Sequence, residues 1–225
     1  MSFHYGQLAQ KVVETLMKEN QLHRILSLDL ETKVLSPENF LTGESLLAVS
    51  LAYQDGGKIH TRVLMAERDD AESERKMLSE LDSFLRDLRP LVIVGYNNTG
   101  YDLPLLTLKV RRSPVPFWAV KDMLSRSFPL DMMHVVKFEI ASYDRSVPTV
   151  MSLEKVLRHP RFANLPLSNG KELINVEGVD KGQVIYDLWK NQRGIFEKYS
   201  ESDAKDVLTI FNHLFIDKPI VAAAG

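Results

Sequence analysis

The sequence predicts a single α/β domain built on a mixed sheet, and two patterns indicate this. Residues 46–53 and 59–65 are β-rich runs separated by Gln54-Asp55-Gly56-Gly57-Lys58, which is typical of a hairpin because Asp-Gly and Gly-Gly accept positive φ. Together with the apolar run 24–32, these two runs are expected to form the first three strands of the sheet, paired antiparallel. Residues 70–88 then have apolar side chains at helical spacing, and the continuous apolar run 91–94 follows, as a buried strand does after a crossover helix.

Composition sets the limits of this interpretation. The chain has 225 residues, of which 44% are hydrophobic and 26% charged, and its net charge of −2 gives no overall basic character for binding nucleic acid. The absence of cysteine excludes disulfides, a thiolate nucleophile and a Cys-ligated zinc site, so a metal must use oxygen or imidazole ligands. No apolar run approaches the roughly 18 residues that span a bilayer, and no charged-then-apolar leader is present at the N-terminus. We therefore expect a cytoplasmic protein.

The other predicted elements follow from apolar spacing and from Pro and Gly. Helices are expected at 6–19, after Asp102, at 148–157 with Thr149 or Ser152 as the cap, and at 183–192 and 194–216. Residues 113–116 predict a rigid loop, 127–134 a short strand leading into a helix, and 221–225 a tail. Residues 158–182 contain two prolines and three glycines and give no assignable pattern.

Two carboxylates stand at the end of the first predicted strand. Because strand side chains alternate, Asp29 and Glu31 share one face, and Leu28 and Leu30 share the other. Two like charges on a buried face are unfavourable unless a cation lies between them. The pattern favours a divalent metal site, and the alternative is an ordinary strand end that runs into a solvated loop.

Two further acidic residues, Asp102 and Asp203, can each be interpreted either as a site residue or as a purely structural one. A Gly- and Asn-rich turn, Gly95 to Tyr101, leaves the buried strand and places Asp102 at a helix start, where it is either a site residue or a helix N-cap. On the last helix Tyr199 and Asp203 lie one turn apart beside an apolar face, although the same stretch is compatible with a charged surface helix.

Taken together, these motifs resemble those of the DEDD superfamily of 3′–5′ exonucleases. The motifs are Asp29-x-Glu31, Asn97-x-x-x-Tyr101-Asp102 and Tyr199-x-x-x-Asp203. The tyrosine of the third motif is similar to that of the DEDDy branch, and the second motif resembles the proofreading domains of family B DNA polymerases. Lys198 stands where the histidine branch has His, and Asp206 is a poorer match than Asp203 because Ser202 stands four residues before it.

This resemblance implies a fold and a division of the chain. The fold is ribonuclease H-like, with a mixed five-stranded sheet in which the first three strands are antiparallel and the rest parallel, flanked by helices. The expected divisions are an N-terminal helical extension at 1–23, the exonuclease domain at 24–216 and a C-terminal tail at 217–225.

The resemblance also implies a two-metal-ion hydrolysis of phosphodiester bonds with Mg²⁺ or Mn²⁺. Asp29, Glu31 and Asp203 would hold the ion that activates water, and Asp29 would bridge to a second ion held by Asp102 directly or through water. Tyr199 would orient the attacking water, since a phenol with a pKa near 10 is a poor base at neutral pH.

Substrate contacts are less sharply indicated by the sequence. Asn97 or Asn98 is expected to touch the terminal nucleotide, and Tyr101, with Tyr96 and Phe40, to stack on a terminal base. The basic clusters at 109–112 and 155–161 are equally well explained as phosphate contacts or as solvated helix faces. The predicted substrate is the 3′ end of single-stranded DNA, with a DNA polymerase or repair protein as a possible partner. The alternatives are an exoribonuclease and an inactive ribonuclease H-like binding or scaffold subunit.

Overall fold

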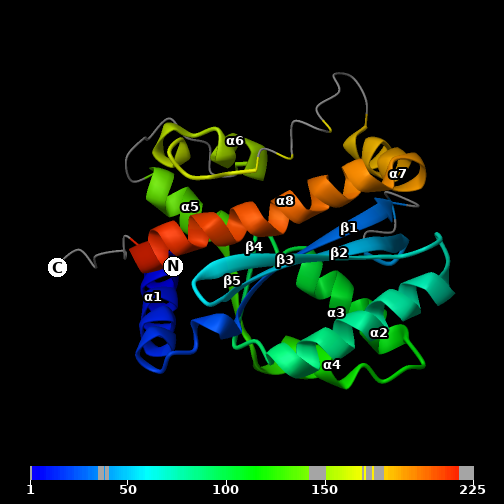
Figure 1. Ribbon diagram of the computed structural model, residues 1–225, viewed down its shortest axis with the longest axis horizontal. Coiled ribbons are helices and arrows are strands. Elements are labelled where there is room, and N and C mark those ends of the chain that lie inside the picture. The colour runs from blue at the N-terminus through cyan, green and yellow to red at the C-terminus, as the bar shows by residue number, and fades with distance from the viewer. Residues whose placement is uncertain are drawn as a thin grey trace.

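The computed structural model describes residues 2–34, 38, 41–141, 151–168, 170, 174 and 180–217. Its centre is a five-stranded sheet in the order β3-β2-β1-β4-β5 (Figure 1). The strands are β1 (Ile25–Val34), β2 (Glu44–Asp55), β3 (Lys58–Met65), β4 (Val92–Gly95) and β5 (Phe128–Asp131). Pairing is antiparallel between β1 and β2 and between β2 and β3, and parallel from β1 to β4 and from β4 to β5. The predicted mixed five-stranded sheet is confirmed.

The hairpin between β2 and β3 forms where the sequence predicts it. Gly56 and Gly57 have φ values of 54° and 77°, and Asp55 pairs with Lys58 on either side of them. Positive φ at both turn positions gives the backbone twist that matches two antiparallel strands, and glycine adopts it without steric strain. The turn therefore fixes the register of β2 against β3.

Eight α-helices lie in the described part of the chain. They are α1 (Ser2–Lys18), α2 (Ala71–Leu88), α3 (Asp102–Arg112), α4 (Trp118–Arg126), α5 (Met132–Ala141), α6 (Leu153–Leu157), α7 (Lys181–Asn191) and α8 (Arg193–Asn212). Ser152 caps α6 as expected, by accepting from the Lys155 amide. The sequence interpretation missed α4. This helix buries only Val120 and Met123, so its apolar pattern is too short to stand out after Pro114 and Pro116.

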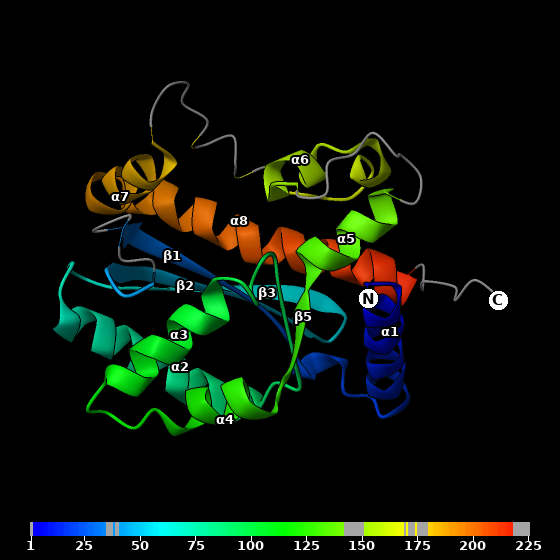
Figure 2. The ribbon, with the colours of Figure 1, turned by 180° about the vertical axis from the view of Figure 1, so that it is seen from behind.

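Helices cover both faces of the sheet (Figures 1 and 2). One buried cluster joins Leu26, Leu28 and Leu30 of β1 to α2, α3 and α4, and a second joins Ile25 and the buried valines of β4 to α1, α5 and the later part of α8. Because side chains alternate along β1, Asp29 and Glu31 point to the face opposite Leu28 and Leu30. That face is covered by α8.

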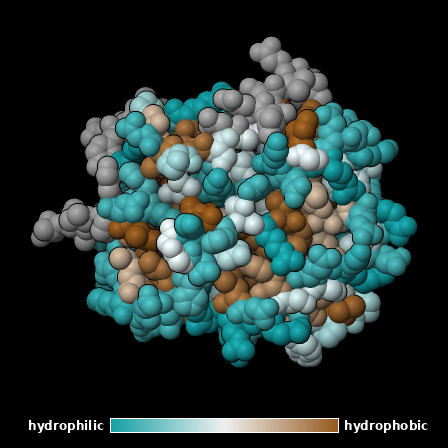
Figure 3. Space-filling view, viewed as in Figure 1, coloured by the Kyte–Doolittle hydropathy of each residue, from teal (hydrophilic) through white to brown (hydrophobic). Residues whose placement is uncertain are grey.

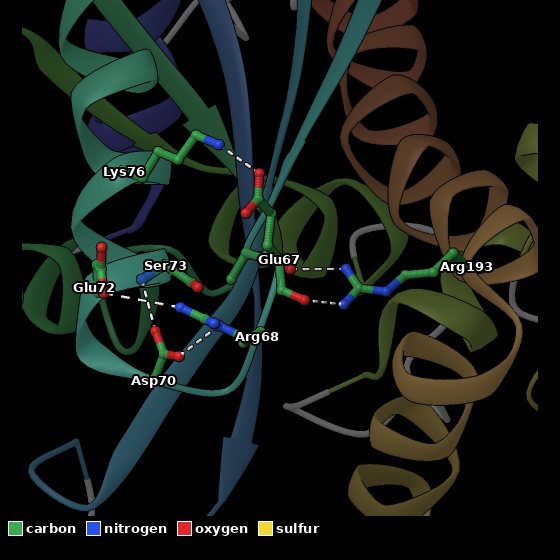
Figure 4. A network of polar contacts seen from close by, with 8 residues as sticks. Glu67, Arg68, Asp70, Glu72, Ser73, Lys76 and Arg193 are labelled. Carbon is green, nitrogen blue, oxygen red and sulfur yellow. Dashed lines mark hydrogen bonds and ion pairs between the residues drawn. The ribbon is translucent and has the colours of Figure 1, made fainter.

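The long helix α8 crosses the sheet and contacts β1, β2, β3 and β4. At its first turn the Arg193 guanidinium donates to the carbonyl oxygens of Ala66 (2.7 Å) and Glu67 (2.8 Å), which ties the helix to the loop between β3 and α2 (Figure 4). Further along, Glu201 accepts from the Thr61 hydroxyl of β3. These contacts fix the angle and register at which α8 presents its side chains to β1.

The N-terminal helix α1 lies beside the β5 edge of the sheet. The Tyr5 hydroxyl donates to the Pro129 carbonyl (2.8 Å) and accepts from the Asp131 amide (2.8 Å), so it takes the place of a neighbouring strand for these two backbone groups. None of the described helices is both long and apolar enough to cross a membrane. The face of the molecule shown in Figure 3 mixes hydrophilic and hydrophobic side chains.

Candidate active site

Three carboxylates from two distant parts of the chain meet between β1 and α8. Asp29, Glu31 and Asp203 each offer one oxygen, and these oxygens all lie within 4.8 Å of one another. Asp203 is 3% exposed and Glu31 is 5% exposed, so the interpretations of a solvated strand end and a charged surface helix are both wrong. The alternation along β1 and the helical repeat of α8 bring the three groups to one point.

The donor set fits a hard divalent cation. Three negative charges this close repel one another, and burial removes the water that would screen them. A cation that binds only the folded site relieves this repulsion, and carboxylate oxygens are the ligands that Mg²⁺ and Mn²⁺ prefer. The arrangement therefore supports the metal-binding interpretation by its chemistry as well as by its spacing.

Asp102 lies next to this group but is held by a different contact. It is the first residue of α3, where the N-cap position belongs to Tyr101, and its Oδ1 accepts from the Leu30 amide at 2.9 Å. The pairing of β4 with β1 ends at Ser27, and Asp102 gives the Leu30 amide its acceptor beyond that point. Asp102 is therefore a bridge between α3 and β1, and the N-cap interpretation is wrong.

The pKa of Asp102 is raised to about 7, mainly because burial disfavours its charged form and also because Asp131 and Asp203 carry like charges nearby. The hydrogen bonds from the backbone act in the opposite direction. A buried carboxyl group that is neutral in acid and charged above neutrality becomes a metal ligand most readily at neutral to alkaline pH.

Tyr199 lies one turn before Asp203 on α8 and is 2% exposed. Burial raises the pKa of its hydroxyl well above 10, and the nearby Glu31, Asp203 and Asp29 charges raise it further. The hydroxyl also hydrogen-bonds to Asp203. Tyr199 therefore keeps its proton at neutral pH in the metal-free protein.

The residues expected to contact substrate fall into two groups. Asn97 is exposed and has a positive φ of 64°, whereas Asn98 is fully buried and its amide nitrogen faces the Ile93 carbonyl oxygen at 3.5 Å. Tyr101 is half-buried, and its hydroxyl contacts Glu44 and the Thr32 hydroxyl at the end of β1. Phe40 lies outside the described residues.

Asp131 supports the site, and the sequence interpretation missed it. This fully buried residue ends β5, and its carboxylate accepts from the amides of Asn97 (2.9 Å) and Thr99 (3.2 Å) and from the Thr99 hydroxyl (2.6 Å). It holds the loop that delivers Asp102. An acidic residue at the carboxyl end of a short predicted strand was the available signal.

Asp206 supports the other side of the site. It is fully buried one turn beyond Asp203, and it accepts from the Ser168 amide at 2.8 Å. Gly170 lies against Ser202, where an added Cβ would come within 1.8 Å of the hydroxyl oxygen. Ser202 in turn donates to the Tyr199 carbonyl at 2.6 Å. Ser168 and Gly170 therefore lie directly against α8 alongside Tyr199 and Asp203.

Comparison with known proteins identifies the family to which the chain belongs. Residues 6–147 match the family model described as DNA polymerase family B, exonuclease domain. A DNA polymerase of Pyrococcus glycovorans is 29% identical over 98 residues, which cover 43% of this chain and 12% of the polymerase. DNA polymerase 1 of Pyrococcus abyssi is 29% identical over 100 residues, covering 44% of this chain and 13% of the polymerase. The matched region thus spans about an eighth of the length of these relatives.

The similarity extends to the fold of most of the chain. The structure of the family B DNA polymerase from the hyperthermophilic archaeon Pyrobaculum calidifontis matches 84% of this chain and 24% of its own, with a TM-score of 0.61 and 20% identity. The family match includes Asp29, Glu31 and Asp102 but ends before α8. The structure brings Tyr199 and Asp203 to the other three residues. On the match over residues 6–147, the chain belongs to the family B DNA polymerase exonuclease domains.

Proposed function

We propose that this chain is a divalent-metal-dependent 3′–5′ exonuclease that hydrolyses phosphodiester bonds at the 3′ ends of single-stranded DNA. The observation that carries the proposal is the convergence of Asp29, Glu31 and Asp203 within 4.8 Å, with the buried Tyr199 beside them. Hydrolysis of a phosphodiester requires an activated water and compensation of negative charge at the phosphate. Buried carboxylates that hold divalent cations meet both needs.

Each residue has a definite part in this proposal. Asp29, Glu31 and Asp203 would hold one divalent ion, and Asp102, beside Asp203, would help to hold a second. When bound, the two ions supply charge neutralisation and a water of lowered pKa. The Tyr199 hydroxyl is proposed to orient the attacking water by a hydrogen bond, which agrees with the raised pKa that burial and the nearby carboxylates give it in the metal-free protein.

The proposed substrate contacts follow from exposure. Asn97 is exposed and Tyr101 is half-buried on the loop between β4 and α3, and both are proposed to contact the terminal nucleotide, with the uncovered part of the Tyr101 ring stacking on its base. Asn98 is buried, so we assign it the role of shaping this loop against β4. We place the catalytic domain at 24–216 and assign α1 to an extension that covers the β5 edge.

The proposal is tested with 5′-labelled single-stranded DNA and RNA in Mg²⁺, Mn²⁺ or EDTA. The wild type should shorten DNA from the 3′ end by single nucleotides, and EDTA or Asp203→Asn should abolish the ladder. Glu197→Gln is the matched control, since Glu197 is exposed on the same helix and should leave activity unchanged.

Two results would change the proposal in different ways. Faster cleavage of RNA than of DNA would reassign the substrate and keep the mechanism. Binding of both polymers by the folded wild type without any cleavage would contradict the exonuclease function and leave a nucleic-acid-binding module.

A further inference from the structure

A recessed surface lies at the end of the sheet opposite the carboxylates. This hollow of about 610 Å³, the arginine pocket, is lined by Arg24, Arg86, Arg89, Arg126 and Trp118, among other residues. Arg24 directly precedes β1, whereas Asp29 and Glu31 lie five to seven residues further along, or roughly 17 to 23 Å at the rise of a strand. Figure 1 shows α4 at the end of the sheet away from the arrowhead of β1. The arginine pocket is therefore separate from the candidate active site.

The four guanidinium groups of the arginine pocket are not equivalent. Arg86 pairs with Asp82 and Arg126 with Asp122, each at 2.9 Å. The Arg24 Nε donates to the Arg89 carbonyl at 2.8 Å, and the Arg89 Nε donates to the Arg86 carbonyl at 3.2 Å. Within the described residues, neither of these two groups lies within ion-pair distance of a carboxylate.

The backbone contacts of Arg24 and Arg89 have a consequence for binding. Each uses its Nε, which leaves the terminal N–H groups of both side chains for an incoming anion. The positive charges of Arg24 and Arg89 both line the arginine pocket, although the net charge of the chain is −2. Paired N–H groups of guanidinium match the two oxygens of a carboxylate, and a pair that is already oriented loses less freedom on binding.

Trp118 supplies an apolar part next to these charges. It is 70% exposed at the start of α4, with the Lys121 ammonium 5.5 Å from its ring centre. Buried Met123 and half-buried Leu91 also line the arginine pocket. Trp, Arg and Met are the side chains enriched in protein–protein interfaces, and Trp and Arg dominate their binding energy.

We propose that the arginine pocket is the docking site for an acidic segment of a partner protein. Carboxylates of the segment bind Arg24 and Arg89, and an apolar side chain next to them packs on Trp118. A nucleic-acid strand fits less well, because a strand held in the arginine pocket would lie at the wrong end of the sheet to present its 3′ end to Asp29. The proposal does not depend on exonuclease activity.

The test uses a fluorescein-labelled peptide of glutamates around one central phenylalanine, titrated with the full chain in about 0.15 M salt. Anisotropy should show saturable binding that weakens at least tenfold in Trp118→Ala and in the double variant Arg24→Ala/Arg89→Ala. Arg68→Ala is the matched control, because Arg68 is an exposed arginine outside the pocket and should leave affinity unchanged. All three proteins should retain the nuclease activity of the wild type.

The fluorescence emission of Trp118 provides a second measurement, which reports on the arginine pocket itself and uses the wild-type protein. Its emission should shift to shorter wavelength as the peptide is added to the wild type, and it should not shift with a peptide in which lysine replaces glutamate. The other tryptophan, Trp189, is 3% exposed and gives a constant background. Absence of peptide binding, or equal binding by Trp118→Ala and the wild type, would overturn the proposal. Displacement of the peptide by single-stranded DNA from this pocket would overturn it in favour of a nucleic-acid site.

Discussion

Replacing Asp102 with Asn is expected to stabilise the metal-free protein at neutral and alkaline pH. Asp102 is 4% exposed, and its pKa in the folded protein is raised from 3.8 to about 7 by burial and by neighbouring carboxylates. A raised pKa means that the folded state binds the proton more tightly than the unfolded state. This contribution to stability is fully present below pH 3.8 and is lost as the pH rises through about 7.

The size of the effect follows from the shift. A change of about 3 pKa units at 1.36 kcal/mol per unit corresponds to about 4 kcal/mol of free energy of unfolding lost between acid and alkaline pH. The asparagine side chain that replaces Asp102 would be neutral throughout, and its amide oxygen can still accept from the Leu30 amide. The substitution should therefore remove most of this loss while keeping the bridge between α3 and β1.

The assay is urea unfolding in EDTA at several pH values from about 5 to about 8. The free energy of unfolding of the wild type should fall across this range, and that of Asp102→Asn should fall much less, so that the variant is the more stable protein at the alkaline end. Asp87→Asn is the control, because Asp87 is exposed on α2. If Asp102→Asn were the less stable protein at the alkaline end, the electrostatic reasoning for this site would be refuted.

Three further predictions concern the supports of the site and its tyrosine. Gly170→Ala should lower the free energy of unfolding by about 1–3 kcal/mol, because the new Cβ would lie 1.8 Å from the Ser202 hydroxyl oxygen. Urea unfolding measures this value, and an unchanged free energy of unfolding would show that the contact is not tight. Tyr5→Phe should cost about 1–2 kcal/mol by the same measurement, since the Pro129 carbonyl and the Asp131 amide both lose their partner, and full stability would contradict that role. Tyr199→Phe should lower kcat by about tenfold to a hundredfold through one lost hydrogen bond, with the shape of the pH–rate profile between about pH 7 and pH 9 unchanged. A tyrosine-dependent rise in that profile would show that the hydroxyl acts as a base.

Local patterns made the elements of the fold and the pairs of site residues within one element predictable, whereas the meeting of β1 with α8 was expected only from the resemblance to the exonuclease motifs. Alternation along a strand places Asp29 and Glu31 together, and a spacing of four residues places Tyr199 beside Asp203. The hairpin at Gly56-Gly57 is set by positive φ values that glycine adopts easily. These relations hold within a few residues and do not require knowledge of what packs against them.

The contacts of the supporting residues were not predictable because their partners are distant in sequence. Asp131 accepts from Asn97 and Thr99, more than thirty residues earlier, and Asp206 accepts from Ser168, 38 residues earlier. The arginine pocket likewise combines the start of β1 with the ends of α2 and α4. Such contacts exist only once the sheet has formed, so no periodicity in the sequence marks them.

The measurement that tests the central claim most directly is calorimetric titration of the metal-free protein with Mn²⁺. If the middle of β1 and the middle of α8 form one metal site, the wild type should show saturable binding that both Asp29→Asn and Asp203→Asn weaken at least tenfold. Glu197→Gln should bind as the wild type does, since Glu197 is exposed on α8 away from the group. Equal affinity in the wild type and in both site variants would contradict the account, because the three carboxylates would then not act as one site.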